Sequence, residues 1–419
     1  MSSQSVPSTR QNPSLPEFIA LIALMTSLTA LAIDAMLPAL PSIAEDLNVS
    51  DYRHTQWVVT SVIFGMAFGQ LLFGPVSDAF GRKFGIISGI ALFCLGAVIS
   101  MMATTLPVLL IGRLIQGFGV SGPRIATMAL VRDQYVGDRM ARVMSFVMMI
   151  FIIVPMMAPM VGQAIITFVS WRAIFALFIV MSVFAAFWLA IRQPETLTDR
   201  TRRPFRLSGI IQAAYISLSH RRVMVFSIIS GLGFGSLLSY IVSSQSIFQD
   251  IYQVGDQFPF YFAALAFGLG LASLANSALV VQFGSERLAA IGLSGMSVLA
   301  GVLMIISLLN QGVPPLWSFM TLGFAIFFCI GILFGNVNSL AMVPLGKMAG
   351  IGAAVVGSVS NVFGVLVSAL VGWFFDATLT PIFAGKNWGE PMGAPTIFEK
   401  QIEIKLLHPA STLESRIQA

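Results

Sequence analysis

Long apolar runs, separated by short polar segments, fill most of the chain. Each run has about 20 residues, the length of α-helix that crosses the ~30 Å hydrocarbon core of a bilayer. The runs lack the alternation of apolar and polar residues over about 10 positions that marks the strands of a membrane barrel. The pattern therefore predicts an all-α polytopic membrane protein. Its eleven predicted spans are residues 18–40, 56–77, 85–104, 107–131, 141–166, 173–191, 222–247, 258–283, 287–309, 315–343 and 349–375.

The composition agrees with this prediction. Of the 419 residues, 57% are hydrophobic and 10% are charged, whereas soluble domains carry about 25% charged residues. The two cysteines, Cys94 and Cys329, lie inside predicted spans in opposite halves of the chain, so no disulfide is expected. The N-terminal tail, residues 1–17, lacks the basic start of a secretory signal. We therefore expect the first span to remain as an anchor.

Basic residues are unevenly distributed between the two sides of the predicted bundle. With the tail 1–17 placed in the cytoplasm, most of the arginines and lysines in loops fall on the cytoplasmic side. The loops on the opposite side receive Arg53 and Arg172. This asymmetry obeys the positive-inside rule. It predicts a multi-pass inner-membrane protein with a cytoplasmic N-terminus, and it accounts for the net charge of +5 without a nucleic-acid partner.

A long basic segment, residues 192–221, divides the spans into two groups. It predicts an N-terminal bundle of six spans at 18–191, a cytoplasmic linker, a C-terminal bundle of five spans at 222–376 and a polar tail at 377–419. Six spans, a long inner linker and further spans are typical of secondary transporters built from two bundles related by a parallel repeat. A loop that is merely long is the alternative.

A dense, charged turn lies between the second and third spans, where residues 72–85 read LFGPVSDAFGRKFG. Gly74 and Gly81 allow a tight reversal and a close approach of the backbone. Arg82 and Lys83 hold the loop on the cytoplasmic side. Taken alone, these residues predict a short, well-anchored turn with a solvated Asp78.

The same stretch resembles the loop signature of the major facilitator superfamily, in which Gly74, Asp78, Gly81, Arg82 and Lys83 occupy the signature positions. Three more stretches extend the resemblance. Residues 110–119, LIGRLIQGFG, are similar to the family's fourth-helix motif, and residues 154–163, VPMMAPMVGQ, to its fifth-helix antiporter motif. DAMLPALP at 34–41, together with WRAIF at 171–175, looks like the bicyclomycin/chloramphenicol-resistance (Bcr/CflA) branch of drug:proton antiporters.

The fifth-helix match rests on Pro155, Pro159 and Gly162, while Ala158 and Gln163 replace glycines that are usual in the family. The resemblance implies a major facilitator fold of two six-helix bundles that exports small amphipathic drugs or toxic compounds in exchange for protons.

The resemblance also implies that Asp78 is a gating charge. In the family this acid lies against the cytoplasmic start of the eleventh helix and pairs with a base that ends the fourth helix, here Arg132. An acid at a helix N-terminus gains about 0.3–1 kcal/mol, which is small enough to be broken in every transport cycle. A static turn with solvated charges is the alternative.

The family has twelve spans, but no apolar run of about 18 residues follows Asp376. We therefore expect the twelfth helix to be missing and the polar tail to lie on the outer side. A frameshift in the gene is another origin for such an abrupt change of composition.

Asp34 is the only acid well inside a predicted span, about 9 Å from its outer end at 1.5 Å per residue. Arg113 lies at a similar depth in the fourth span. Because an unpaired charge at that depth costs at least ~2.5–3.5 kcal/mol, the two are expected to face each other. The functional interpretation makes Asp34 the proton carrier, and a permanent structural ion pair is the alternative.

Further residues at membrane depth are candidates for a substrate cavity. Arg124 either lines the cytoplasmic cavity or extends towards the interface. The methionines of the fifth span, Met149 among them, suit a promiscuous apolar pocket but are also common packing residues. The uncharged candidates, each of which forms a helix-to-helix hydrogen bond in the alternative reading, are Gln70, Tyr240, Gln245 and Asn361.

No pattern indicates an enzyme. The three histidines have no metal-binding spacing, and no nucleotide-binding glycine loop is present in the sequence. We therefore predict a monomeric, gradient-driven transporter whose partners are a small-molecule substrate, protons and the lipid bilayer, without a metal or cofactor. The alternatives are an exporter of an endogenous metabolite on the same scaffold and a transport-impaired, truncated family member.

Overall fold

The computed structural model describes residues 13–50, 52–135, 137–197, 205 and 207–373. Within these residues all regular structure is helical. The polar tail at 377–419, and the prediction that it lies on the outer side, fall outside the described residues.

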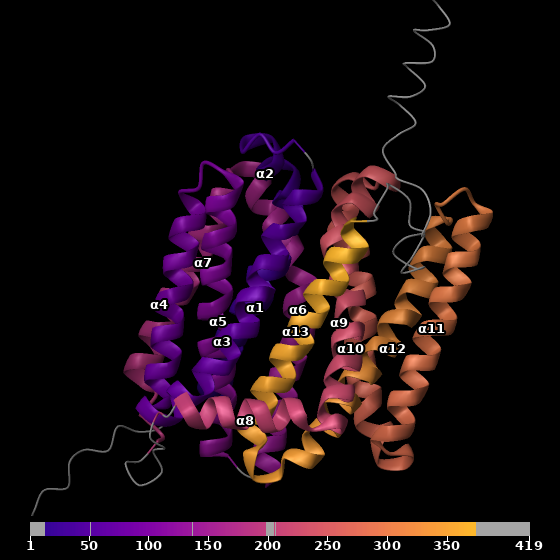
Figure 1. Cartoon of the computed structure of the whole chain (residues 1–419). Helices are drawn as coiled ribbons and strands as arrows, with labels where there is room; N and C mark the ends of the chain where they lie inside the picture. Colours follow the sequence, from indigo (N-terminus) through magenta and orange to yellow (C-terminus); the bar gives the residue numbers. More distant parts are fainter. Residues whose placement is uncertain (1–12, 51, 136, 198–204, 206, 374–419) are drawn as a thin grey trace, which may run out of the picture.

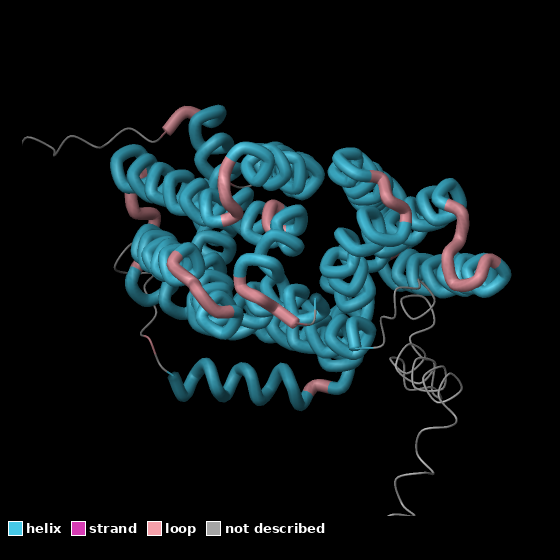
Figure 2. Tube along the Cα trace, turned by 90° about the horizontal axis from the view of Figure 1, so that it is seen from above, coloured by secondary structure: helices cyan, strands magenta, loops and turns pink. Residues whose placement is uncertain are grey.

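The helices form two bundles joined by a short helix (Figure 1). The first bundle contains α1 (Leu15–Asp34), α2 (Leu40–Asp46), α3 (Trp57–Phe80), α4 (Arg82–Met101), α5 (Leu106–Gln134), α6 (Gly137–Phe168) and α7 (Arg172–Arg192). The second contains α9 (Arg221–Gln245), α10 (Phe258–Phe283), α11 (Ser285–Leu309), α12 (Leu316–Met342) and α13 (Ala349–Trp373). The connecting helix α8 (Leu207–Ser219) lies across one end of the long helices, and in Figure 2 it runs along the edge of the two bundles.

The prediction of a helical, multi-pass membrane protein is confirmed. Ten helices among the described residues are long and apolar enough to cross a membrane. The remaining predicted span, 141–166, falls within α6, in which residues 153–168 form a shorter apolar helix by the same measure. We call the end that carries α2 the α2 end, and the opposite end, where α8 lies, the α8 end (Figure 1). The sequence predicts that the α8 end is cytoplasmic.

The first span is not one continuous α-helix. Proline lacks a backbone N–H, so Pro38 cannot donate to the carbonyl of Asp34, four residues earlier. Accordingly α1 ends at Asp34, and a 3₁₀ turn over Leu37–Ala39 leads into α2. This break leaves the last carbonyl groups of α1 without partners inside the helix.

The two bundles meet along two pairs of helices, α3 with α13 and α6 with α10. At the first of these contacts the Ser358 hydroxyl of α13 donates to the Ala67 carbonyl of α3 at 2.5 Å. Gly357 of α13 lies against the side chain of Gln70, because a Cβ added at Gly357 would lie 2.5 Å from Oε1 of Gln70. The bundle interface therefore runs directly beside Gln70.

The hydrophobic core is continuous across the bundles at one end only. At the α2 end a single cluster joins side chains of α1, α3 and α7, such as Val58, with side chains of α9, α10 and α12, such as Phe262. Towards the α8 end the clusters stay within one bundle: Phe18 and Leu130 belong to a cluster of the first bundle, and Val223 to a cluster of the second. The described core therefore seals the α2 end and leaves the bundles less joined at the α8 end.

Candidate functional site

Arg113 is fully buried in α5 and hydrogen bonds to the backbone of two other helices. Its Nε donates to the Val58 carbonyl of α3 at 2.9 Å, and its Nη2 donates to the Ala32 carbonyl of α1 at 2.5 Å. Its Nη1 donates to Oε1 of Gln116 at 2.6 Å. Ala32 lies in the last turn of α1, where carbonyls lack helical partners and a cation is favourable. Arg113 thus caps the broken end of α1.

The expected ion pair between Asp34 and Arg113 is wrong for this structure. Asp34 is 5% exposed, and it makes no ion pair or hydrogen bond with any of the described residues. The break after Asp34 explains the difference, because it offers Arg113 a backbone carbonyl in place of the carboxylate. Asp34 instead lies within electrostatic range of Tyr240, which α9 supplies from the second bundle.

The antiporter-like segment of α6 also meets the end of α1. Pro155 and Pro159 lie inside the helix. A Cβ added at Gly162 would lie 2.0 Å from the Ala35 carbonyl, so the backbones of α6 and α1 are in direct contact one residue beyond Asp34. Glycine is required at this position because any side chain would separate the two helices. The structure therefore gathers Asp34, Arg113, Gly162 and Tyr240 around one break in α1.

The four uncharged candidates are buried, and each has a polar atom without a hydrogen-bond partner among the described residues. These atoms are Nε2 of Gln70, the hydroxyl of Tyr240, Oε1 of Gln245 and Nδ2 of Asn361. The alternative reading, in which these atoms form helix-to-helix hydrogen bonds, is therefore not what the structure contains. Buried polar groups are normally satisfied, so such a set indicates a place where water or a ligand supplies the missing partner.

Aromatic rings extend from Tyr240 into the second bundle. Tyr240 stacks on Phe262 of α10, with centroids 5.8 Å apart, and meets Phe327 of α12 edge to face at 4.8 Å. Met149, by contrast, is 47% exposed on α6 and does not belong to this buried group. The apolar side of the candidate site is thus aromatic, and the role predicted for Met149 gains no support from its position.

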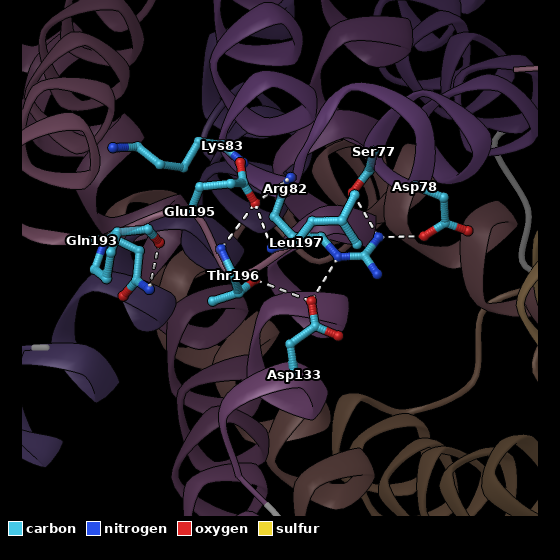
Figure 3. A network of polar contacts seen from close by, with 10 residues as sticks. Ser77, Asp78, Arg82, Lys83, Asp133, Gln193, Glu195, Thr196 and Leu197 are labelled. Carbon is cyan, nitrogen blue, oxygen red and sulfur yellow. Dashed lines mark hydrogen bonds and ion pairs between the residues drawn. The ribbon is translucent and has the colours of Figure 1, made fainter. Parts of the chain in front are cut away.

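The charged turn between α3 and α4 lies at the α8 end and forms a separate network (Figure 3). Nη1 of Arg82 bonds to Asp78 and to Oγ of Ser77, at 3.1 Å for the latter, and Nε of Arg82 donates to Asp133 at 2.8 Å. The expected pairing of Asp78 with Arg132 is therefore corrected. Arg132 is exposed, and its neighbour Asp133 faces the turn. Arg82 is four residues from Asp78 and reaches it across the turn.

The two glycines of the turn differ in what they do. Gly81 has a φ of +116°, a backbone conformation that favours glycine, and it separates α3 from α4. Gly74 lies within α3, and a Cβ added there would meet nothing within 4 Å. The close approach expected at Gly74 is therefore wrong, because α3 continues to Phe80 and Gly74 lies inside the helix rather than in the turn.

Glu195 completes this network and was not recognised from the sequence. Its Oε1 accepts from the backbone N–H of Arg82 and its Oε2 from that of Lys83, both at 3.0 Å. These N–H groups belong to the first turn of α4, where no helical partner exists and an anion is favourable. Thr196 donates to Asp133 at 3.1 Å. The segment after α7 is thus fixed to the turn, and the only signal in the sequence is an acid directly after Pro194.

Replacing Glu195 with Ala is expected to lower the free energy of unfolding by about 1 kcal/mol, the usual cost of losing a helix N-cap. The measurement is a denaturant titration of the purified protein. Glu45→Ala is the control, since Glu45 is exposed near the C-terminal end of α2, and a surface substitution of this kind usually changes the free energy of unfolding by less than about 0.5 kcal/mol. Equal stability of Glu195→Ala and the native chain would mean that the carboxylate does not cap α4.

Three comparisons with known proteins agree with this architecture. The family model of the Major Facilitator Superfamily matches residues 22–369. A protein described as a bicyclomycin resistance protein homolog, from Haemophilus influenzae, is 30% identical over 370 residues, which are 87% of this chain and 91% of that one. Multidrug resistance protein D of Escherichia coli is 26% identical and covers 84% of this chain and 87% of its own. A D-xylose–proton symporter superposes with a TM-score of 0.70 at 16% identity, over 89% of this chain and 95% of that one.

Proposed function

The chain belongs to the Major Facilitator Superfamily, and we propose that it exports small amphipathic compounds across the inner membrane in exchange for protons, by alternating access. The observation that carries the proposal is Asp34, a buried acid without a partner among the described residues, placed where α1 breaks and where both bundles meet. The names of the relatives, which are resistance proteins, support export as the direction of transport and drugs as the kind of substrate.

Asp34 is the proposed proton carrier. Three of the five N–H donors of Arg113 bond to two carbonyls and to Gln116, and none bonds to Asp34, so Arg113 does not neutralise the carboxylate by direct contact. An ionised side chain without a partner at this depth costs about 2.5–3.5 kcal/mol, which links the protonation of Asp34 to whether water reaches it. A movement of the bundles that opens the site to one side and then to the other would load and release one proton. Arg113 is the proposed positioning residue, because it holds the end of α1.

The substrate is proposed to bind between the bundles. Tyr240 with Phe262 and Phe327 supplies an aromatic surface, and the unpartnered atoms of Gln70, Gln245 and Asn361 supply hydrogen bonds. Small-molecule sites combine an apolar lining with a few polar groups in this way. Such a lining suits amphipathic compounds, and it does not restrict the site to one particular compound.

The separation of the apolar clusters supports a state that is open at the α8 end, the proposed cytoplasmic side. In this state Asp78 bonds to Arg82 of its own bundle. We propose that in the opposite state Asp78 lies against the N-terminus of α13, where the helix dipole favours an anion. The turn is then a gate that stabilises the form closed to the cytoplasm.

Asp78→Ala is expected to disfavour that closed form about two- to five-fold, the equivalent of the 0.3–1 kcal/mol that an acid gains at a helix N-terminus. A cysteine pair placed at the α8 ends of α3 and α13 should then crosslink less in the variant, with Cys94 and Cys329 replaced by alanine. Asp250→Ala, which removes an exposed acid at the other end of the molecule, is the control. Unchanged crosslinking in Asp78→Ala would make the turn a static one.

The function is tested in proteoliposomes with an imposed pH gradient. Addition of an amphipathic drug should cause proton release that depends on the protein and on the gradient. No proton movement with a panel of drugs, together with accumulation of one metabolite in a deletion strain, would favour an exporter of an endogenous metabolite. No transport of either kind would favour a transport-impaired family member.

A further inference from the structure

Arg124 is a second arginine at membrane depth in α5, and the site described above does not use it. It follows Arg113 by 11 residues, which is three turns and about 16 Å along the helix, so both lie on nearly the same face. Thr127 on this helix bonds to Met25 of α1, and Ser121 bonds to Met66 of α3. Arg124 lies between these two directions and therefore faces the space between α1 and α3.

No acid among the described residues compensates the charge of Arg124. It is only partly exposed, and it makes no ion pair or hydrogen bond in the part of the chain that the structure describes. Asp34 lies at the level of Arg113, which bonds to Ala32, and is thus about three helical turns away. Of the other acids whose side chains the structure describes, Glu17, Asp46, Asp78, Asp133, Glu195 and Glu286 bond elsewhere, and Glu45, Asp250 and Asp256 are exposed in segments outside the long helices or at their ends.

Two amide groups with unused donors lie between the level of Arg124 and the level of Asp34. A Cβ on Gly69 of α3 would meet Ser121 of α5, so Gln70 is about one helical turn from the level of Arg124. Gln70 contacts Gly357 of α13, and Asn361 lies one turn further along that helix towards the α2 end, about two turns from the level of Arg124. The amide nitrogens of Gln70 and Asn361 are the unpartnered atoms, and both side chains are less than one tenth exposed.

We propose that Arg124, with the amides of Gln70 and Asn361, forms a subsite for an anionic oxygen group of the transported compound, such as a carboxylate, a sulfonate or a phosphate. A guanidinium group offers five N–H donors in a planar fork that fits such groups in a bidentate way. The guanidinium-bearing residue Arg124 lies about 16 Å from the level of Asp34, and the two amides lie between these levels, so an anion bonded to Arg124 does not contact the coupling carboxylate. The inference rests on the proposed export function and narrows its substrate class to amphipathic compounds with one acidic group.

The test uses two probes that share a ring system. 8-Anilinonaphthalene-1-sulfonate carries a sulfonate, and N-phenyl-1-naphthylamine lacks it. The full-length protein in phosphatidylcholine nanodiscs is treated with phenylglyoxal, and arginine modification is measured by mass spectrometry. The sulfonate probe should protect Arg124 at least five-fold, and the neutral probe should not. Arg287, an exposed arginine at the α8 end of α11, should be modified equally in all samples.

Binding to variants gives a second measurement. Arg124→Gln should weaken binding of the sulfonate probe at least ten-fold and change binding of the neutral probe less than two-fold, whereas Arg124→Lys should retain most of the affinity. Arg287→Gln is the matched control and should bind both probes as the native chain does. If Arg124→Gln does not fold, the protection experiment on the native chain still tests whether Arg124 binds the sulfonate group.

Equal protection by both probes, or protection by neither, would overturn the subsite. Protection of Arg124 by phosphatidylglycerol added to the disc, and not by the sulfonate probe, would also overturn it, because the anion would then be a lipid headgroup. These outcomes are distinct from failure of the proposed function. That failure would appear as an absence of proton-coupled transport of both probes, whatever their effect on Arg124.

Discussion

Asp34→Asn is expected to abolish proton-driven uphill export while the protein folds and still binds its substrate. The substitution keeps the shape of the side chain and removes the group that takes up the proton. One charge moved through 100 mV supplies about 2.3 kcal/mol, a concentration ratio of about 50-fold. The variant should not build up this concentration ratio, and the substrate should only reach equal concentrations on the two sides of the membrane. Accumulation of a fluorescent drug in inverted membrane vesicles with an imposed gradient measures it.

The control is the same substitution at an acid outside the site. Asp46 lies at the end of α2, its side chain is 46% exposed, and it pairs with Arg172. Asp46→Asn should therefore accumulate substrate as the native protein does. The coupling role of Asp34 would be refuted by uphill accumulation in Asp34→Asn that equals the native level. Loss of accumulation in both variants would point to a defect of expression or folding, which a melting curve of each purified protein separates.

The membrane helices were predictable because their signal is additive along the chain. Apolar runs of about 20 residues predicted eleven spans, and ten helices among the described residues are long and apolar enough to cross a membrane. The structure places the helices α3, α4 and α5 close to the predicted limits. The predicted end of the second span was less accurate, because α3 continues to Phe80. An apolar count cannot decide whether a polar residue such as Asp78 ends a helix or sits in its last turn.

For the candidate site, the sequence indicated most of the polar residues that are buried in the structure, but not which of them bond to each other. Matching the depth of Asp34 and Arg113 treats the two charges as the only partners available. The break before Pro38 frees a backbone carbonyl at Ala32, and Arg113 bonds to that carbonyl. Every residue carries a backbone carbonyl, so the sequence does not mark which carbonyl will accept a hydrogen bond from a distant side chain. Such a partner is found only when the positions of the helices are known.

The turn network shows a second reason for the same limit. Glu195 lies 113 residues after Arg82 and caps α4 from the segment that follows α7. Nothing local to either residue predicts the contact, because it depends on where the first bundle brings its two ends together. Asp78 was expected to bond to Arg132, yet the neighbouring residue Asp133 is the one that faces Arg82. Neighbouring residues on a helix point about 100° apart. A sequence-based prediction of span limits, which is accurate to a few residues, therefore cannot decide which of two neighbours faces a given partner.

Glycines hold α3 and α5 in direct backbone contact, and this contact sets the position of Arg113. A Cβ added at Gly117 of α5 would lie 1.9 Å from the Val62 carbonyl of α3, and one added at Gly65 would lie 2.1 Å from the Leu114 carbonyl. Each helix therefore presents a glycine to the backbone of the other. A methyl group has no space at either position unless the helices move apart, since the atoms in the way are backbone atoms.

Gly117→Ala is consequently expected to lower the free energy of unfolding by about 1–3 kcal/mol, the usual cost of overpacking, and to reduce transport. The larger helix propensity of alanine offsets at most about 1 kcal/mol of this loss. Thermal unfolding in detergent measures the change. Gly301→Ala in α11 is the control, because a Cβ there meets nothing within 4 Å, and its melting temperature should stay equal or rise. If Gly117→Ala melts with or above the native protein, α3 and α5 do not touch through Gly117, and the bonds of Arg113 to Val58 and Ala32 do not depend on that contact.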